Sequence, residues 1–388
     1  MVCPIPQRNE FILNEGLVYL NHAGVAPIPQ RAARAVSECA MLMSRQGAWD
    51  YTPYRDLQQR FRQRAAWLVG GDEAGICPVA NTSEGLSMVG LGLNWRPGDE
   101  IVTTDQEFPS NKLIWSDLSR RHDLVLHQVP ADSAGRILSQ DLLARVNGRT
   151  RILALSSVQF RNGAVADLPA LGAALGHTPT LLVVDGIQSL GLLPMEAASW
   201  GLDAVVADGH KWLLGPEGCG LMYLSPKALA QVEPRLLGWH SQDLAGDYDR
   251  PARDWRPGAL RFQAGSPNLL GMAGLDATLD MLQEIGIAPI QRRVHQLMEP
   301  LTRGVQELGG IILTPLGADG LPEAGILVFS HPQVAMPVLS RGLQERGIFH
   351  AVRGGGIRLS PHFYQAHHDM MRALSALEEC LNPRHRSP

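Results

Sequence analysis

Short apolar runs alternate with helix-like stretches between about residues 76 and 224, and this alternation restricts the fold more than any other feature. The runs lie at 100–104, 124–129, 151–158 and 181–185. Strands that are apolar on both faces are typical of parallel sheets, in which helices cover both sides. The pattern therefore predicts an α/β fold with a mostly parallel sheet flanked by helices.

The alternation ends after residue 224, and a different pattern follows. Residues 231–268 are rich in Gly, Pro, Trp and Arg, and long helical stretches come next. A chain of 388 residues is long enough for two domains. We expect a large domain at 18–265 and a smaller C-terminal α+β domain at 266–388. An N-terminal arm, residues 1–17, is expected to pack on the smaller domain.

The composition argues against several classes of protein. The net charge of −4 is mild and there is no basic block, so nucleic acid and anionic membranes are poor partners. The five cysteines are scattered, without a CxxC pair or a Cys/His cluster, so neither a metal site nor a disulfide framework is expected. The N-terminus has no signal-peptide core, and no apolar run approaches the ~18 residues of a membrane helix. We expect a cytoplasmic protein.

Two polar side chains follow apolar runs at the place where a parallel sheet binds ligands, outside the carboxyl ends of its strands. Asp185 ends the run 181–185, and Lys211 stands just past the run 202–207. A lysine and an acid on neighbouring strand ends are the pair that pyridoxal phosphate (PLP) needs, because the lysine holds the aldehyde and the carboxylate holds the pyridinium nitrogen. The alternatives are a surface lysine and a helix-capping aspartate.

Further stretches carry candidate ligand contacts. Asn81–Gly85 opens a helix, whose free N–H groups and hydroxyls suit a phosphate dianion; the alternative is a plain capped helix. Gln188, three residues after Asp185, would reach the 3′-oxygen side of the same ligand. Phe108 would stack on a flat cofactor ring or else belong to the core. Arg358, which follows three glycines, suits bidentate binding of a carboxylate or else forms a structural salt bridge.

Four segments, in their order and spacing, resemble the class V aminotransferase family: 185–188 (DGIQ), 209–211 (GHK), 261–268 (RFQAGSPN) and 356–360 (GIRLS). That family includes cysteine desulfurases, selenocysteine lyases, kynureninases and isopenicillin N epimerase-like proteins. The resemblance covers nearly the whole chain, and the combined pattern is specific for PLP but not for the reaction. It implies the fold of the type I PLP-dependent transferases and a homodimer with shared active sites.

The resemblance also implies a role for each position that matches the family pattern. Lys211 resembles the Schiff-base lysine, and Asp185 resembles the pyridinium partner. The other implied cofactor contacts are Gln188 at the 3′-oxygen, Phe108 on the ring face, Gln159 in a neighbouring loop, Ser266 from the other subunit, and Thr82, Ser83, Asp208 and His210 at the phosphate. The implied substrate contacts are Arg358, which would hold the α-carboxylate, and Asn21, His22 and Ala23, which would line the pocket.

This sequence departs from the family pattern in three places. Asp208 stands where many relatives have serine, and Phe108 stands where desulfurases usually have histidine. Desulfurases carry a nucleophilic cysteine shortly before the carboxylate-binding arginine, but the stretch 347–356 contains none. A cysteine desulfurase is therefore not expected.

The expected function is PLP-dependent catalysis on a small-molecule α-amino acid through Lys211. Transamination is the favoured reaction, with β-elimination by a carbon–sulfur lyase close behind. Epimerisation comes third, because no second base is identified on the opposite face. The alternative in which the protein is not an enzyme is a catalytically silent PLP-binding sensor. The intact set of Lys211, Asp185 and Arg358 argues against it.

Overall fold

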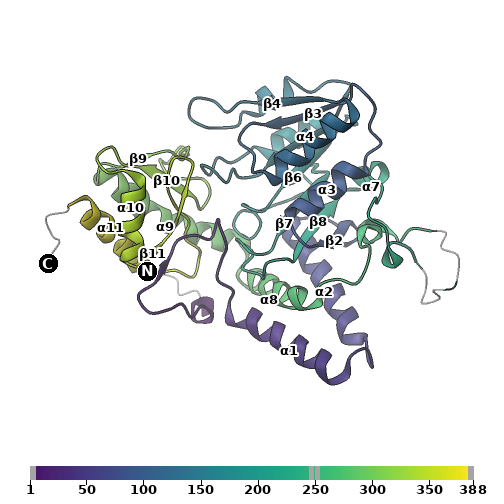
Figure 1. Cartoon of the computed structure of the whole chain (residues 1–388), viewed down its shortest axis with the longest axis horizontal. Helices are drawn as coiled ribbons and strands as arrows, with labels where there is room; N and C mark the ends of the chain where they lie inside the picture. The colour runs from purple at the N-terminus through teal and green to yellow at the C-terminus, as the bar shows by residue number, and fades with distance from the viewer. Residues whose placement is uncertain (1–5, 244–248, 250–253, 383–388) are drawn as a thin grey trace.

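A seven-stranded sheet forms the centre of the larger of two lobes in the computed structural model, which describes residues 6–243, 249 and 254–382 (Figure 1). Across the sheet, the strands are β2 (Ile76–Val79), β8 (Gly220–Leu224), β7 (Ala204–Asp208), β6 (Leu181–Asp185), β5 (Thr150–Ser156), β3 (Glu100–Thr104) and β4 (Val125–Val129). The strands from β7 to β4 run parallel, and β8 is antiparallel to both of its neighbours. The expected α/β fold with a mostly parallel sheet is confirmed.

The central strands are apolar throughout because helices cover both faces of the sheet. Successive side chains of a strand point to opposite faces. In β6, Leu181 and Val183 belong to one buried cluster, whereas Leu182 and Val184 belong to the other. The first cluster includes α3 (Thr82–Gly92), α4 (Ser110–His122) and α7 (Pro226–Gln231), and the second includes α2 (Thr52–Val69), α5 (Ser139–Leu143), α6 (Leu168–Leu175) and α8 (Leu269–Ile285).

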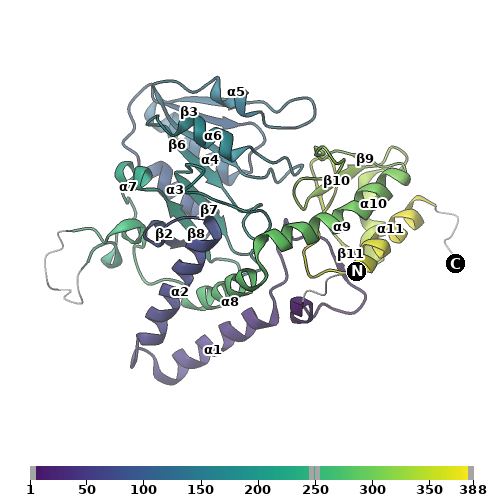
Figure 2. The ribbon, with the colours of Figure 1, turned by 180° about the vertical axis from the view of Figure 1, so that it is seen from behind.

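The smaller lobe is built on an antiparallel sheet of four short strands. Their order is β12 (Ala351–Arg353), β13 (Gly356–Leu359), β10 (Leu327–Ser330) and β9 (Ile311–Ile312). Helices α9 (Ile287–Glu307), α10 (Met336–Glu345) and α11 (His367–Leu381) pack around it, and α9 crosses into this lobe from the end of α8 (Figure 2). A separate parallel pair joins β1 (Val18–Tyr19) to β11 (Ile348–Phe349). This lobe is the expected smaller α+β domain.

Helix α8 packs with the larger lobe, although the sequence places it in the smaller domain. It lies against α1 (Gln30–Gln46) and α2, whereas α9 packs against α11 (Figures 1 and 2). The two helices meet at Gly286, whose φ of 81° suits glycine. We therefore propose a domain boundary at this glycine, about twenty residues later than the sequence suggests.

The described part of the N-terminal arm contacts the smaller lobe. The Phe11 ring stacks on Tyr364 with a centroid distance of 3.7 Å and meets Phe363 edge-on at 6.0 Å. Just before it, the 3-10 helix η1 (Pro6–Glu10) ends in Glu10, whose carboxylate accepts from Arg31 of α1 at 2.8 Å. The arm thus ties the smaller lobe to α1. Residues 1–5 of the arm and 383–388 of the smaller domain lie outside the described residues.

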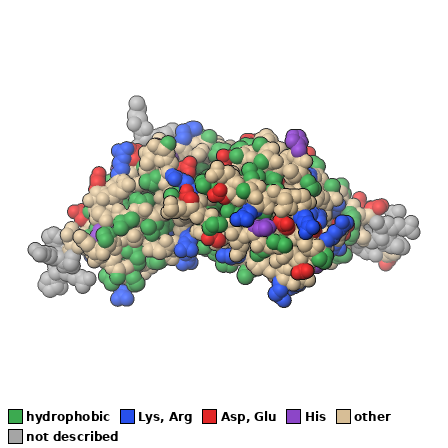
Figure 3. Space-filling model, turned by 90° about the horizontal axis from the view of Figure 1, so that it is seen from above, with side chains coloured by type: hydrophobic (Ala, Val, Ile, Leu, Met, Phe, Trp, Pro, Cys, Tyr) green, Lys and Arg blue, Asp and Glu red, His purple; other side chains and the backbone are tan. Residues whose placement is uncertain are grey.

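No helix in the described part of the chain is both long and apolar enough to cross a bilayer. On the face seen from above, charged side chains of both signs lie among hydrophobic ones (Figure 3).

The remaining short elements are the 3-10 helices η2 (Glu73–Gly75), η3 (Trp239–Ser241) and η4 (Gly258–Phe262).

Candidate active site

A cavity of about 370 Å³ lies at the carboxyl ends of β6 and β7, where the two lobes meet. Its volume falls in the range that is typical of small-molecule sites. Six ionisable side chains line it: Asp185, Asp208, His210, Lys211, Arg353 and Arg358. The first four come from the larger lobe and the two arginines come from the smaller one, so the cavity depends on the packing of both.

Lys211 follows β7 in a tight loop. The carbonyl of Lys211 accepts a hydrogen bond from Leu214, a buried residue held at φ 59°, which is an unusual conformation for a non-glycine residue. Gly209 is required here because a Cβ atom would lie 2.7 Å from the carbonyl oxygen of Cys219. Strand and loop packing therefore directs Lys211 into the cavity.

The pKa of Lys211 is lowered to about 8, mainly because burial penalises the charged ammonium. The neighbouring Arg358 lowers it further, whereas Asp185 and Asp208 oppose the shift. The ammonium nitrogen lies 5.6 Å from the centre of the Phe108 ring. A lysine in this state is a much better nucleophile and base near neutral pH than a surface lysine.

Asp185 is buried at the end of β6. Its Oδ1 accepts a hydrogen bond of 3.0 Å from the Ile187 N–H, so it does cap the turn that follows. Burial raises the pKa of this carboxyl to about 6. Among the described residues, no cation lies within ion-pair distance of it. A buried carboxylate that lines a cavity without a cationic partner suits a cationic ligand group.

Gln188 lines the same cavity, but both ends of its amide are already engaged. Its Nε2 donates to the carbonyl of Ala23 at 3.0 Å, and its Oε1 accepts from the Trp212 indole at 2.9 Å. The side chain therefore joins the segment at Ala23 to the loop after Lys211. Ala23 lines the cavity, as expected from the sequence.

The start of α3 forms one end of the cavity. Asn81 caps this helix by accepting from the Glu84 N–H, and Thr82 and Ser83 in its first turn line the cavity. The Thr82 hydroxyl accepts from the Asp208 N–H at 3.1 Å, which ties α3 to the end of β7. Free N–H groups and hydroxyls in this arrangement suit a phosphate dianion.

The Asp208 carboxylate at this end does not stand alone. Its Oδ1 accepts from the Gly209 N–H at 2.7 Å, and its Oδ2 lies 3.0 Å from Nδ1 of His210. The carboxylate is therefore engaged by its own loop. This contact orients the imidazole of His210, which also lines the cavity.

Aromatic rings form a wall of the cavity. Phe108 is 41% exposed, so it is not a core residue, and it meets Phe160 edge-on with ring centres 5.0 Å apart. Sequence reasoning missed Phe160; the available signal was an aromatic residue in the loop after β5. Both rings line the cavity and are placed to contact a flat ligand.

Gln159 is not among the residues that line the cavity, and its contact with the cofactor stays a prediction. Its Nε2 donates to the buried Glu107 carboxylate at 2.7 Å. Glu107 also accepts from the Ser156 N–H at 2.9 Å and from Asn111 at 2.8 Å. Burial raises the pKa of Glu107 to about 7. This acid, which the sequence analysis did not single out, fastens the loop after β5 to the start of α4.

Arg358 of β13 is 3% exposed and has no acidic partner among the described residues. Its Nη1 donates to the Phe160 carbonyl at 3.0 Å, its Nη2 donates to Asn21 Oδ1 at 3.2 Å, and its Nε has no partner in the described chain. Burial, and then the charge of Arg353, lowers the pKa of Arg358 to about 10. The alternative role of Arg358, a structural salt bridge, is therefore not observed among the described residues. A buried guanidinium without a counterion is suited to an anionic ligand.

Asn21 and His22 are not among the residues that line this cavity, and their contact with the substrate stays a prediction. Asn21 instead holds Arg358. His22 is fully buried, with Nδ1 2.8 Å from the Ser360 carbonyl and Nε2 2.7 Å from the Tyr364 hydroxyl. Asn21 therefore positions a side chain that lines the cavity, and His22 fastens its own segment to the smaller lobe.

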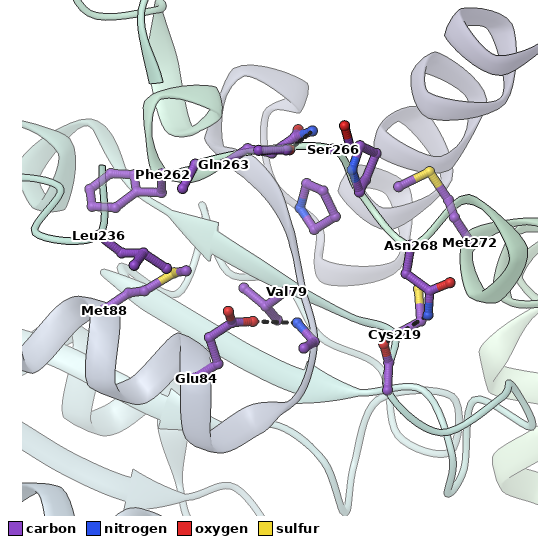
Figure 4. A pocket seen from close by; sticks show the side chains of 16 residues that line it. Val79, Glu84, Met88, Cys219, Leu236, Phe262, Gln263, Ser266, Asn268 and Met272 are labelled. Carbon is purple, nitrogen blue, oxygen red and sulfur yellow. Dashed lines mark hydrogen bonds between the residues drawn. The ribbon is translucent and has the colours of Figure 1, made fainter. Parts of the chain in front are cut away.

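Ser266 lines a second cavity, away from Lys211 of its own chain. Figure 4 shows Ser266 and Gln263 on one side of this cavity, with Val79 and Glu84 across from them. The Glu84 carboxylate accepts from the Ala80 N–H at the same place. Ser266 is not among the residues that line the Lys211 cavity of its own chain.

The residues around the first cavity fit PLP. The start of α3 suits its phosphate, the unpaired Asp185 carboxylate suits its pyridinium nitrogen, and Lys211 suits its aldehyde. The fold and this site define a PLP-dependent enzyme of fold type I. The family model described as Aminotransferase class-V matches residues 18–374, and the chain belongs to that family.

Curated relatives extend over the same length. A probable cysteine desulfurase of Methanothermobacter thermautotrophicus is 28% identical over 96% of this chain and 96% of its own. A probable cysteine desulfurase of Pseudomonas putida is 31% identical over 82% of this chain and 80% of its own. The isopenicillin N epimerase of Streptomyces clavuligerus is 26% identical over 96% of both chains.

Solved structures show the same architecture. A C-DES variant with glycine covalently linked to its PLP cofactor superposes with a TM-score of 0.88 at 25% identity, covering 96% of this chain and 99% of its own. The cystine C–S lyase C-DES in complex with its product, cysteine persulfide, gives 0.86 at 25% identity, with 94% and 98% covered.

Proposed function

We propose that this enzyme is a carbon–sulfur β-lyase that acts on an α-amino acid with a leaving group on Cβ. One observation carries the proposal: Lys211, whose pKa is lowered, lines one cavity together with Asp185 and Arg358, and no cysteine of the described residues lines it. The likeness to a cystine C–S lyase supports β-elimination over the transamination favoured from the sequence. A persulfide carrier is not supported, because burial raises the pKa of the Cys219 thiol, which lies outside this cavity, to about 12.

The side chains of the cavity divide the work. PLP, when bound, supplies an electron sink for the pair that remains when Cα loses its proton. Arg358 binds the substrate α-carboxylate, because its buried guanidinium has a free Nε–H and no counterion. Lys211, as the free amine, takes the Cα proton. Asp185 would stabilise the cation at the pyridinium nitrogen, and Thr82, Ser83 and His210 would hold the phosphate.

The bond changes balance with water as the only added reactant. The Cα–H bond breaks and its proton moves to Lys211 Nζ. The bond between Cβ and sulfur then breaks, and the electron pair leaves with the sulfur, which takes up a proton as a thiol. Water finally releases the remaining carbon skeleton as a keto acid, together with ammonia. Phe108 and Phe160 form an aromatic wall of the cavity.

Transamination is the second candidate, because PLP, if bound, would support it as well and Lys211 would again move the proton. The description of the matched family, Aminotransferase class-V, supports this reaction. Epimerisation has less support: His210, the other nitrogen base in the lining, faces Asp208.

We also propose a homodimer with shared sites, in which Ser266 of each chain serves the cavity of the other. Its position on a separate cavity of its own chain supports this arrangement. The described cysteines form no disulfide, which supports a reducing compartment such as the cytoplasm.

A half-reaction experiment tests the reaction class. The PLP form is mixed with S-methyl-L-cysteine or L-cystine without a keto-acid acceptor, and keto acid, ammonia and thiol are measured per site. A β-lyase releases keto acid, ammonia and the sulfur product continuously, the last as methanethiol from S-methyl-L-cysteine and as cysteine persulfide from L-cystine, whereas one keto acid per site without ammonia would establish transamination. Lys211→Ala should slow either reaction by about 10²–10⁴-fold. Lys112→Ala, outside the cavity, is the matched control, and equal losses in both variants would contradict the role of Lys211.

A further inference from the structure

A second arginine stands at the mouth of the cavity. Arg353 ends β12 and lines the cavity together with Arg358 of the adjacent strand. Its side chain is exposed, and its one hydrogen bond in the described chain goes from Nη1 to the neighbouring Val352 carbonyl at 2.9 Å. No acidic group pairs with it among the described residues.

The hairpin that carries Arg353 is held in place by close backbone packing. Arg353 is the register partner of Gly356, and Gly354 and Gly355 form the turn at φ 60° and 86°. A Cβ atom on Gly354 would lie 2.3 Å from the carbonyl oxygen of Arg161, in the loop that also presents Phe160 to the cavity. The packing of Gly354 against the Arg161 loop, together with the pairing of β12 with β13, therefore fixes the backbone at Arg353 beside the cavity.

Arg353 is the charged side chain of the cavity lining to which the proposed function assigns no ligand group. In the proposed function, Arg358 takes the α-carboxylate, the start of α3 takes the phosphate, and Asp185 takes the pyridinium. Arg353 has no group assigned to it, and its charge acts on Arg358 closely enough to lower the pKa of that guanidinium. An uncompensated pair of guanidinium groups in one cavity favours a ligand that carries two negative charges.

We propose that Arg353 is a specificity-determining residue that binds a second acidic group at the end of the substrate side chain. The substrate class is thus an α-amino acid whose side chain ends in a carboxylate or another acidic group. Exposed Val25 and Phe108 line the same cavity and provide apolar contact for the linking methylene groups. This inference deepens the proposed function, since it relies on Arg358 as the α-carboxylate site.

Equilibrium binding tests the paired arginines without any turnover. Succinate, glutarate and adipate are titrated into the PLP form by calorimetry, with butyrate, valerate and hexanoate as chain-length controls. At least one dicarboxylate should bind about 10- to 100-fold more tightly than its control, since a charge-assisted contact is worth about 1.5–3 kcal/mol. Arg353→Gln should reduce that preference to about twofold or less.

The control variant is Arg161→Gln, which removes a positive charge from an exposed residue of the neighbouring loop that does not line the cavity. It should keep the preference for the dicarboxylate. The proposal is overturned if no dicarboxylate is preferred, or if the preference survives in Arg353→Gln or disappears equally in Arg161→Gln.

A matched substrate pair extends the test to catalysis. S-(2-carboxyethyl)-L-cysteine and S-propyl-L-cysteine have side chains of similar length and differ in the terminal carboxylate. The carboxylate substrate should have a kcat/KM about tenfold higher or more, lost in Arg353→Gln and partly kept in Arg353→Lys. Turnover of both substrates at equal kcat/KM would contradict this inference alone. Absence of turnover with a clear dicarboxylate preference would contradict the lyase assignment alone and support the paired-arginine site.

Discussion

At the scale of single residues, the site depends on charges that are held in an environment of low polarity. Lys211 is pulled in two directions: burial and Arg358 favour the free amine, whereas Asp185 and Asp208 favour the ammonium. Burial dominates, so the pKa falls from 10.5 to about 8. A substantial fraction of Lys211 is therefore ready to capture an aldehyde at neutral pH.

This balance predicts how cofactor capture by the apoprotein depends on pH. Only the free amine reacts, so the rate constant for PLP capture should rise with pH through a midpoint near 8, set by the pKa of Lys211. Arg358→Gln removes a positive neighbour and should move the midpoint up by up to about one pH unit. Asp185→Asn removes a negative neighbour and should move it down.

The rate constant is measured by stopped-flow absorbance at about twelve pH values between pH 6 and pH 10, and the midpoint is taken from its dependence on pH. Nα-acetyllysine, measured in parallel, corrects for titration of PLP itself. Shifts of the same sign in the two variants would show that neighbouring charges do not set the pKa of Lys211.

At the scale of secondary-structure elements, the sequence was most informative where both faces of an element are buried. The strands β3 and β6 have the predicted bounds, because short runs rich in apolar and β-branched residues are compatible with few alternatives in a covered sheet. Helix α3 begins at Thr82, inside the stretch 81–85 that was predicted to open it, and Asn81 caps it. That cap is what brings Thr82 and Ser83 to the cavity.

Close packing of α6 gives a stability prediction at this scale. A Cβ atom on Gly172 would lie 1.6 Å from the Trp200 carbonyl oxygen, so Gly172→Ala must displace backbone. We expect a loss of about 2 kcal/mol or more in the free energy of unfolding. The matched control is Gly176→Ala at the end of the same helix, where φ is −56° and the nearest atom is 3.4 Å away.

The measurement is the urea midpoint of the two apoprotein variants against wild type. Gly176→Ala should lie within about 1 kcal/mol of wild type, since its backbone conformation suits alanine. Equal effects at the two glycines would mean that α6 does not pack as closely on the Trp200 loop as the structure describes.

At the scale of the whole molecule, function depends on surfaces from distant parts of the sequence. The larger lobe supplies Lys211 and Asp185, the smaller lobe supplies Arg353 and Arg358, and the proposed dimer adds Ser266 of the partner chain. The arm at Phe11 and the pairing of β1 with β11 fasten the lobes together. A site of this kind is sensitive to assembly as well as to its own side chains.

The shared-site dimer predicts complementation between two inactive variants. Lys211→Ala lacks the reactive amine, and Ser266→Asp would repel the phosphate of the partner's site. If Ser266 acts across the interface, a mixed dimer contains one fully wild-type site, so refolding the variants together should restore about a quarter of the wild-type activity. If Ser266 acts within its own chain, both sites of the mixed dimer are defective.

Activity is measured after co-refolding, with each variant refolded alone as the control and the dimer mass checked by light scattering. Recovery no greater than the sum of the two variants would contradict sharing of sites, as would full activity of a wild-type monomer.

The sequence by itself determined the parallel sheet, its strand ends and the positions of Asp185 and Lys211 at or just past those ends, because short-range patterns of apolar residues specify which strands are buried and where they end. Only the tertiary structure decided what distant side chains do. Gln159 turns to Glu107, His22 turns to Ser360 and Tyr364, and α8 joins the larger lobe. Those outcomes depend on contacts between segments far apart in the chain, where hydrogen bonds and packing compete, and no local pattern records which contact is formed.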